Sequence, residues 1–257
     1  MKINKISISS WTSSFRVSNS ISGNQNTYKV PPLSTVFGLI SAAKGDLYIP
    51  KSDLKLGYFF DYQTSADDVE KIYYHPANGV GEKSNVVFRN QLFFCRLIIY
   101  TSDYEIANYF QSPKFPILLG RSSDVATVDE ISLIEVTPKK KLDKVTGTIV
   151  PFQKSIHGAT IFSLPVFFFN ETKQSRKLLL VDNYFMLDYF IKRLHVIEGE
   201  GFTDDTFKCN DVFCSHCYEN NYEVKCGYFS SGIDIYWQDL SKLHNYLYEH
   251  QNKKYLH

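Results

Sequence analysis

The first 136 residues contain strand-like and helix-like segments in one order, and that order restricts the fold more than any other feature of the sequence. Four segments have the composition of β-strands, and two have the apolar spacing of helices. In chain order they span residues 3–11 (strand), 33–44 (helix), 55–63 (strand), 91–100 (strand), 102–111 (helix) and 129–136 (strand). This β-α-β-β-α-β order predicts an α+β fold with a ferredoxin-like domain, as in RNA-recognition modules.

The helix over residues 33–44 has recognisable start and stop signals. Two prolines precede it, and Ser34 or Thr35 is placed to act as the N-cap. Gly45 stands where a C-terminal cap belongs. Gly38 inside the helix costs about 1 kcal/mol relative to alanine. Such a glycine indicates close approach, either of a strand backbone or of a ligand.

The second half of the chain is aromatic and rich in predicted strands before it ends in a helix. We therefore expect two domains, at residues 1–145 and 146–257. The terminal helix is predicted over residues 233–250, with one apolar face that docks against the core or a partner. That face consists of Trp237, Leu240, Leu243 and Leu247, with His244 as an alternative to Leu243.

Positive charge is concentrated although the net charge is only +1. Residues 1–45 carry five Lys or Arg side chains and no Asp or Glu. A second basic run contains Lys139, Lys140 and Lys141. A basic face of this kind favours nucleic acid as a partner. No apolar run approaches the roughly 20 residues that span a bilayer, and residues 1–10 lack the apolar core of a signal peptide, so we expect a cytoplasmic protein without a membrane partner.

Four of the five cysteines lie close together in the sequence. Their spacing is Cys209-x4-Cys214-x2-Cys217-x8-Cys226, and His216 is a competing ligand. In a reducing compartment, four thiols at this density favour a tetrahedral, structural zinc site. The alternative is a loop that contains free thiols.

Three collinear blocks of the sequence resemble a known family. The first begins at Phe15-Arg16 and continues with PPLSTVFGLISAAKG at residues 31–45. The second is PILLGRSSD at residues 116–124, and the weaker third is GTIVP at residues 147–151. Together they resemble the fifth numbered Cas family of the CRISPR-associated RAMP superfamily, in a type I-B-like form.

The resemblance implies a function, a set of partners and one structural detail. Members of that family cap the 5′ handle of the crRNA in Cascade complexes of antiviral defence. They contact the backbone and large subunits, and meet target DNA only indirectly. In that family an insertion such as residues 64–88 here forms a thumb-like hairpin that grips RNA.

The residues that we expect to bind RNA combine this resemblance with side-chain chemistry. Arg16 and Lys29 are candidate phosphate ligands, and Phe15 and Tyr28 are candidates for base stacking. The start of the first helix can bind phosphate through its free amides. The remaining candidates are Ser34, Thr35, Arg121, Ser122, Lys139, Lys140 and Lys141.

Two other functions remain open at the level of sequence. A metal-independent endoribonuclease could use His75 with a neighbouring tyrosine, or His157 with Lys154. The type I-C members of the resembling family cut RNA with a tyrosine and an adjacent Lys-His pair, and this chain has no Lys-His dipeptide. We therefore expect a non-catalytic protein. The second alternative is a zinc-stabilised protein-interaction module without affinity for RNA.

Overall fold

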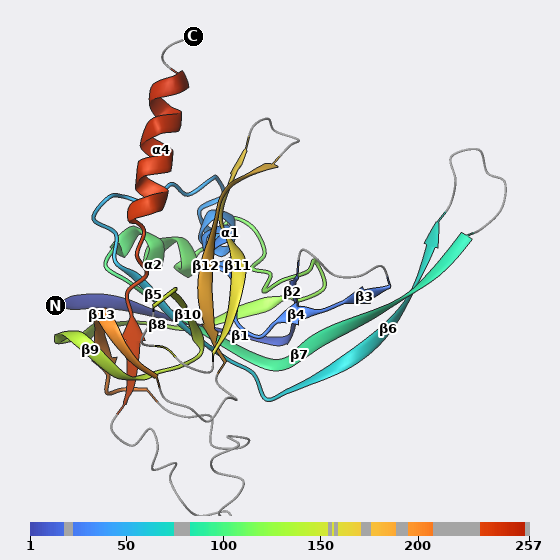
Figure 1. Cartoon of the computed structure of the whole chain (residues 1–257), viewed down its shortest axis with the longest axis horizontal. Coiled ribbons are helices and arrows are strands. Elements are labelled where there is room, and N and C mark those ends of the chain that lie inside the picture. Colours follow the sequence, from blue (N-terminus) through green and yellow to red (C-terminus); the bar gives the residue numbers. More distant parts are fainter. Residues whose placement is uncertain are drawn as a thin grey trace, which may run out of the picture.

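The computed structural model consists mostly of strands, with helices α1, α2 and α4 (Figure 1). It describes residues 1–17, 23–74, 83–153, 156, 159–170, 176–188, 195–207 and 232–254. The strands are β1 (Lys2–Ser13), β2 (Phe15–Arg16), β3 (Asn24–Gln25), β4 (Thr27–Tyr28), β5 (Leu56–Asp61), β6 (Thr64–Tyr74), β7 (Lys83–Thr101), β8 (Ala126–Glu135), β9 (Pro138–Val145), β10 (Thr148–Pro151), β11 (Thr160–Asn170), β12 (Arg176–Leu187), β13 (His195–Asp204) and β14 (Ile233–Tyr236). The helices are α1 (Leu33–Lys44), α2 (Tyr104–Gln111) and α4 (Ser241–Lys254).

The largest sheet is built from the first half of the chain. Its order is β3-β7-β1-β8, and β5 and β6 pair with successive parts of the long strand β7. β1 is antiparallel to both β7 and β8, and β5 is antiparallel to β7. The elements β1, α1, β5, β7, α2 and β8 therefore follow one another in the predicted order.

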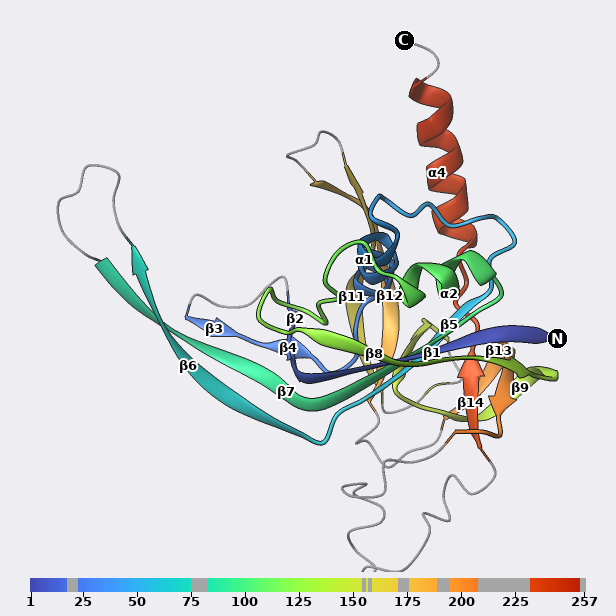
Figure 2. The ribbon, with the colours of Figure 1, turned by 180° about the vertical axis from the view of Figure 1, so that it is seen from behind.

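The third predicted strand is longer than the sequence indicated. Strand β7 begins at residue 83, because its first half pairs with β6 in a ribbon that extends away from the sheet. Figures 1 and 2 show this β6–β7 ribbon projecting from the body of the molecule. The insertion at residues 64–88 thus supplies both arms of a hairpin.

The main sheet is covered on both faces because residues on β1 and β7 alternate between two hydrophobic clusters. Ile6, Ile8 and Leu97 pack with α1, α2, β11 and β12. Ile3 and Ile98 pack on the other face, against residues of β13 and β14. The first cluster contains side chains from both sides of the predicted domain boundary at residue 145.

The ends of the helices confirm some sequence signals and correct others. Gly45 caps α1 with a φ of 87°, and Asp103 caps α2 by accepting a hydrogen bond from the backbone N–H of Glu105. The prediction that Ser34 or Thr35 is the N-cap of α1 is wrong. Pro32 occupies that position, because its restricted φ already suits the start of a helix.

The predicted terminal helix begins eight residues too early. Residues 233–236 form β14, and α4 begins at residue 241. Leu240, Leu243 and Leu247 pack into the first cluster as expected, whereas Trp237 packs into the second. No helix in the part of the chain that the structure describes is long and apolar enough to cross a membrane.

A buried ion pair connects the main sheet to β13. Lys5 Nζ lies 2.6 Å from Asp204 Oδ2, and the Tyr100 hydroxyl donates to the same carboxylate at 2.7 Å. Burial by itself raises the pKa of Asp204. Hydrogen bonds from Lys5, Thr206 and Tyr100 outweigh burial, so the net pKa lies below the ordinary value of 3.8.

Asp204→Asn is expected to lower the free energy of unfolding by about 3 kcal/mol at neutral pH, because it leaves Lys5 without its partner. The lowered pKa means that this stabilisation is present above pH 4 and is lost as the pH falls through the folded-state value. Urea denaturation between pH 2 and 7 measures both effects. The control is Glu105→Gln, which breaks an exposed pair with Lys51 and should cost less than about 1 kcal/mol. Equal costs for the two variants would contradict the prediction.

Candidate nucleic-acid interface

The segment that follows β1 is held between the core and the β6–β7 ribbon. Phe15 pairs with Tyr28 and Arg16 with Thr27 in the short β2–β4 ladder. The Thr27 hydroxyl accepts a 2.6 Å hydrogen bond from the backbone N–H of Phe15. Strand β3 then runs parallel to β7, at the ribbon (Figure 1). The described residues between β1 and α1 therefore pair as strands, β2 with β4 and β3 with β7.

The two aromatic candidates in this segment lie in the core. Phe15 and Tyr28 are 3% and 4% exposed. Phe15 packs edge-on against Phe60, and Tyr28 packs edge-on against Phe162. Neither ring presents an open face to a base, which corrects the expectation that they stack.

Arg16 has the opposite environment. Its side chain is exposed, and within the described residues no hydrogen bond or ion pair engages its guanidinium. Lys29 is half-buried instead; its Nζ donates to Asn90 Oδ1 at 3.1 Å and lies 5.6 Å from the centre of the Tyr62 ring. Burial lowers the pKa of Lys29, although nearby carboxylates oppose this change. Arg16 is therefore the more available of the two cations.

The second sequence block folds around a buried carboxylate. Asp124 is completely buried and accepts hydrogen bonds from the Arg121 backbone N–H at 2.9 Å and the Thr12 hydroxyl at 2.9 Å. The Arg121 guanidinium lies 3.4 Å from the same carboxylate. Gly120 has a φ of 131°, and a Cβ there would lie 2.6 Å from the Ser14 carbonyl oxygen. This close approach brings the block at residues 116–124 against the start of the first block.

The exposed face of α1 contains Ser34, Thr35 and Gly38. Both hydroxyl residues are partly exposed in the first turn, where the helix has no side-chain cap. Gly38 is exposed, and a Cβ at this position would meet no atom within 4 Å. The alternative that Gly38 allows close packing against a strand is therefore wrong.

The second basic run lies elsewhere on the molecule. Lys139, Lys140 and Lys141 belong to β9, at the opposite end from the β6–β7 ribbon in both views (Figures 1 and 2). Lys139 donates to Thr203 and forms an ion pair with Asp234. Lys140 and Lys141 are exposed. The structure does not bring these lysines together with Arg16.

An exposed aromatic pair was missed by the sequence analysis. Trp11 on β1 and Phe94 on β7 are 77% and 45% exposed, and their ring centres are 5.4 Å apart. Phe94 also has a φ of 53°, which is costly for an aromatic residue and is typical of functional positions. The signal for Trp11 was available, because it follows Ser7 and Ser9 on the polar side of β1.

Several predicted residues lie outside the part of the chain that the structure describes. They are His75, Lys154, His157, Cys209, Cys214, His216, Cys217 and Cys226. Among the described residues, no group of three His, Cys, Asp or Glu side chains is placed to hold a metal ion. The zinc site and the nuclease alternatives thus remain predictions.

Comparison with known proteins gives structural similarities only. No protein-family model and no curated protein sequence matches the chain. A chain of a CRISPR RNA-guided surveillance complex is 15% identical, with a TM-score of 0.46 over 76% of this chain and 89% of that one. A CRISPR protein from Archaeoglobus fulgidus is 13% identical, with a TM-score of 0.42 over 79% and 96%. A chain of the Type III-B Cmr-beta complex bound to cognate target RNA and AMPPnP is 8% identical, with a TM-score of 0.49 over 76% and 86%.

At identities of 8–15% and TM-scores below 0.5, these similarities do not indicate a function for this chain.

Gly38→Ala is expected to raise the free energy of unfolding by about 1 kcal/mol, because alanine favours the helix and its Cβ meets open space. Urea denaturation measures the change. The matched control is Gly57→Ala, whose Cβ would lie 2.8 Å from Ile235 and should destabilise the fold. A loss of stability at Gly38 would contradict the open helix face.

Proposed function

We propose that the chain is a non-catalytic RNA-binding subunit of a type I CRISPR interference complex, and that it holds the 5′ handle of the crRNA. One observation carries this proposal. The two blocks that resemble the fifth numbered Cas family meet in space where Gly120 contacts Ser14, beside the strand that carries the exposed Arg16. The first half of the chain contains strands and helices in the order expected for a ferredoxin-like domain, and this order supports an RNA-binding role.

The proposed interface uses two kinds of contact. The Arg16 guanidinium binds a phosphate, and its planar group suits a bidentate contact. Trp11 and Phe94 provide ring faces on which unpaired bases stack. Gly38 leaves room for the RNA backbone to approach α1, which explains a glycine that the fold itself does not require.

In the proposed role, the guide RNA and not this protein recognises the target sequence. In guided complexes base pairing recognises the target, and the protein contacts the backbone and shape of the guide. The chain would thus contact crRNA and the other Cascade subunits directly and target DNA indirectly. Zinc held by Cys209, Cys214, Cys217 and Cys226 would stabilise a small loop; this part of the proposal rests on their spacing in the sequence alone.

Arg16→Ala is expected to weaken binding of a labelled repeat RNA from the protein's own genomic locus about tenfold, because a charged hydrogen bond to phosphate is lost. The slope of log K against log salt should fall by about 1. Filter binding at several salt concentrations measures both quantities, and gel analysis should recover the RNA uncut.

The control for Arg16→Ala is Lys140→Ala, which removes an exposed charge at the other end of the molecule and should leave affinity unchanged. Equal losses for the two variants would indicate general electrostatic attraction. A discrete cut in the RNA without added metal would instead show an endoribonuclease. Failure to prefer the repeat over a scrambled RNA would reject the handle-binding role.

Trp11→Ala is expected to weaken the same RNA complex by about 1–3 kcal/mol, the usual contribution of one stacked base. Its effect should depend only slightly on salt, because no charge is removed. Tyr104→Ala serves as the control, since Tyr104 is also exposed but lies on α2. Trp11→Phe should retain most of the affinity. An unchanged affinity in Trp11→Ala would remove the aromatic pair from the interface.

A further inference from the structure

Strand β8 forms one edge of the main sheet. It pairs with β1 along one side, and no strand pairs along its length on the other side within the described residues. An edge strand presents unpaired N–H and C=O groups that can accept another strand. At ten residues, β8 is longer than a typical strand, so this edge is extensive.

The chain already uses the beginning of this edge. Leu118 forms an antiparallel bridge with Val125, and the N–H of Ala126 donates to the carbonyl oxygen of Ile117 at 2.9 Å. This pairing stops where the chain leaves the strand at Pro116. The outer edge of β8 is therefore able to pair in β geometry at its beginning. Further along, the pairing of β8 with β1 shifts register at Asp129, between Val128 and Glu130.

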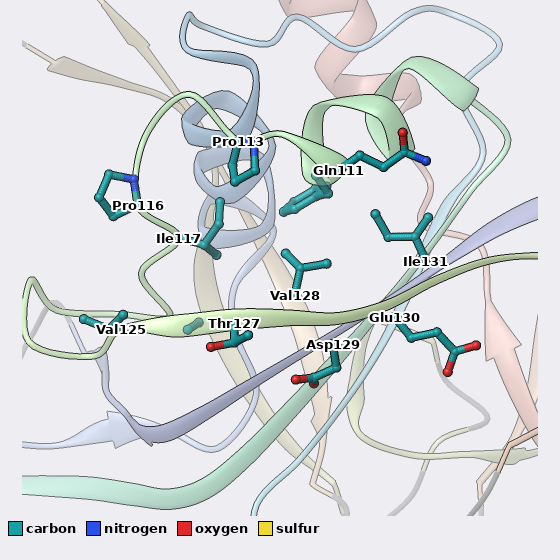
Figure 3. Close-up of a pocket in the computed structure, with 12 residues that line it drawn as sticks. Gln111, Pro113, Pro116, Ile117, Val125, Thr127, Val128, Asp129, Glu130 and Ile131 are labelled. Carbon is teal, nitrogen blue, oxygen red and sulfur yellow. The ribbon is translucent and has the colours of Figure 1, made fainter.

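A pocket of about 640 Å³ lies beside this edge (Figure 3). Side chains from the end of α2, the following loop and β8 converge on it, as Figure 3 shows for Pro113, Ile117, Val128 and Ile131. The alternate side chains of an added strand could enter this space. Such pockets give specificity to strand addition, whereas main-chain hydrogen bonds give affinity.

The charged residues beside β8 indicate which kind of partner can bind there. Asp129 and Glu130 are the charged residues that line the pocket, and both are acidic. Leu133, further along the strand, is 62% exposed. RNA is disfavoured at an edge with this charge, whereas a peptide with apolar and basic side chains complements it.

We propose that β8 binds an extended segment of a partner protein, which adds to the sheet as a strand. The segment carries apolar residues at alternate positions, for the pocket, and Lys or Arg residues that face Asp129 and Glu130. The proposal does not depend on RNA binding.

The test uses a phage-displayed library of random dodecapeptides, selected on the full chain. Enriched peptides should contain alternating apolar residues with at least one Lys or Arg. A synthetic copy of the strongest peptide should slow hydrogen exchange of the β8 amides at least tenfold. Glu130→Lys should weaken that peptide roughly threefold to tenfold. The matched control, Glu135→Lys, makes the same charge change outside the pocket and should have a smaller effect.

Three results would overturn the proposal. The first is the absence of enriched peptides, or enrichment of acidic ones. The second is protection of amides away from β8 by the bound peptide. The third is self-association in sedimentation experiments that Glu130→Lys abolishes, because this would assign the edge to a second copy of the chain. None of these results would decide whether the chain binds RNA, because RNA binding is measured in a separate experiment.

Discussion

The structure depends on one strand, β1, which pairs along both edges and is buried on both faces over its first half. Ile6 and Ile8 face the helices, while Ile3 faces β13 and β14. Lys5 also points toward β13, where Asp204 compensates its charge. Without this ion pair, a lysine on the covered face of a central strand would be costly to bury. The cover ends further along β1, and there Trp11 is exposed.

The candidate interface lies near the end of β1, where no other described element covers Trp11. The buried carboxylate of Asp124 receives hydrogen bonds from Thr12 on β1 and from the backbone of Arg121. This contact fixes the loop at residues 116–124 against the strand that leads to Arg16. Arg121 therefore has a structural partner, although the resemblance made it a candidate RNA-binding residue. Arg16 is exposed, and no hydrogen bond or ion pair engages its guanidinium within the part of the chain that the structure describes.

Two parts of the main sheet have different chemical characters. At the β6–β7 ribbon, β3 pairs with β7 close to the polar residues that follow β1. At the edge formed by β8, an open backbone is combined with an apolar pocket and the acidic residues Asp129 and Glu130. A nearly neutral chain can thus offer separate surfaces to an anionic and a cationic partner, because charges of opposite sign are segregated in space.

The sequence by itself determined the order of six helices and strands in the first half of the chain and the cap at Gly45, since periodicity and capping depend on neighbours along the chain. It could not determine which aromatic rings are buried. Phe15 was expected at the surface, and Trp11 was overlooked, because burial depends on what packs opposite each ring. Likewise, only the tertiary structure separated Lys140 from Arg16, since distance along a chain does not set the distance between two surfaces once the sheets have packed.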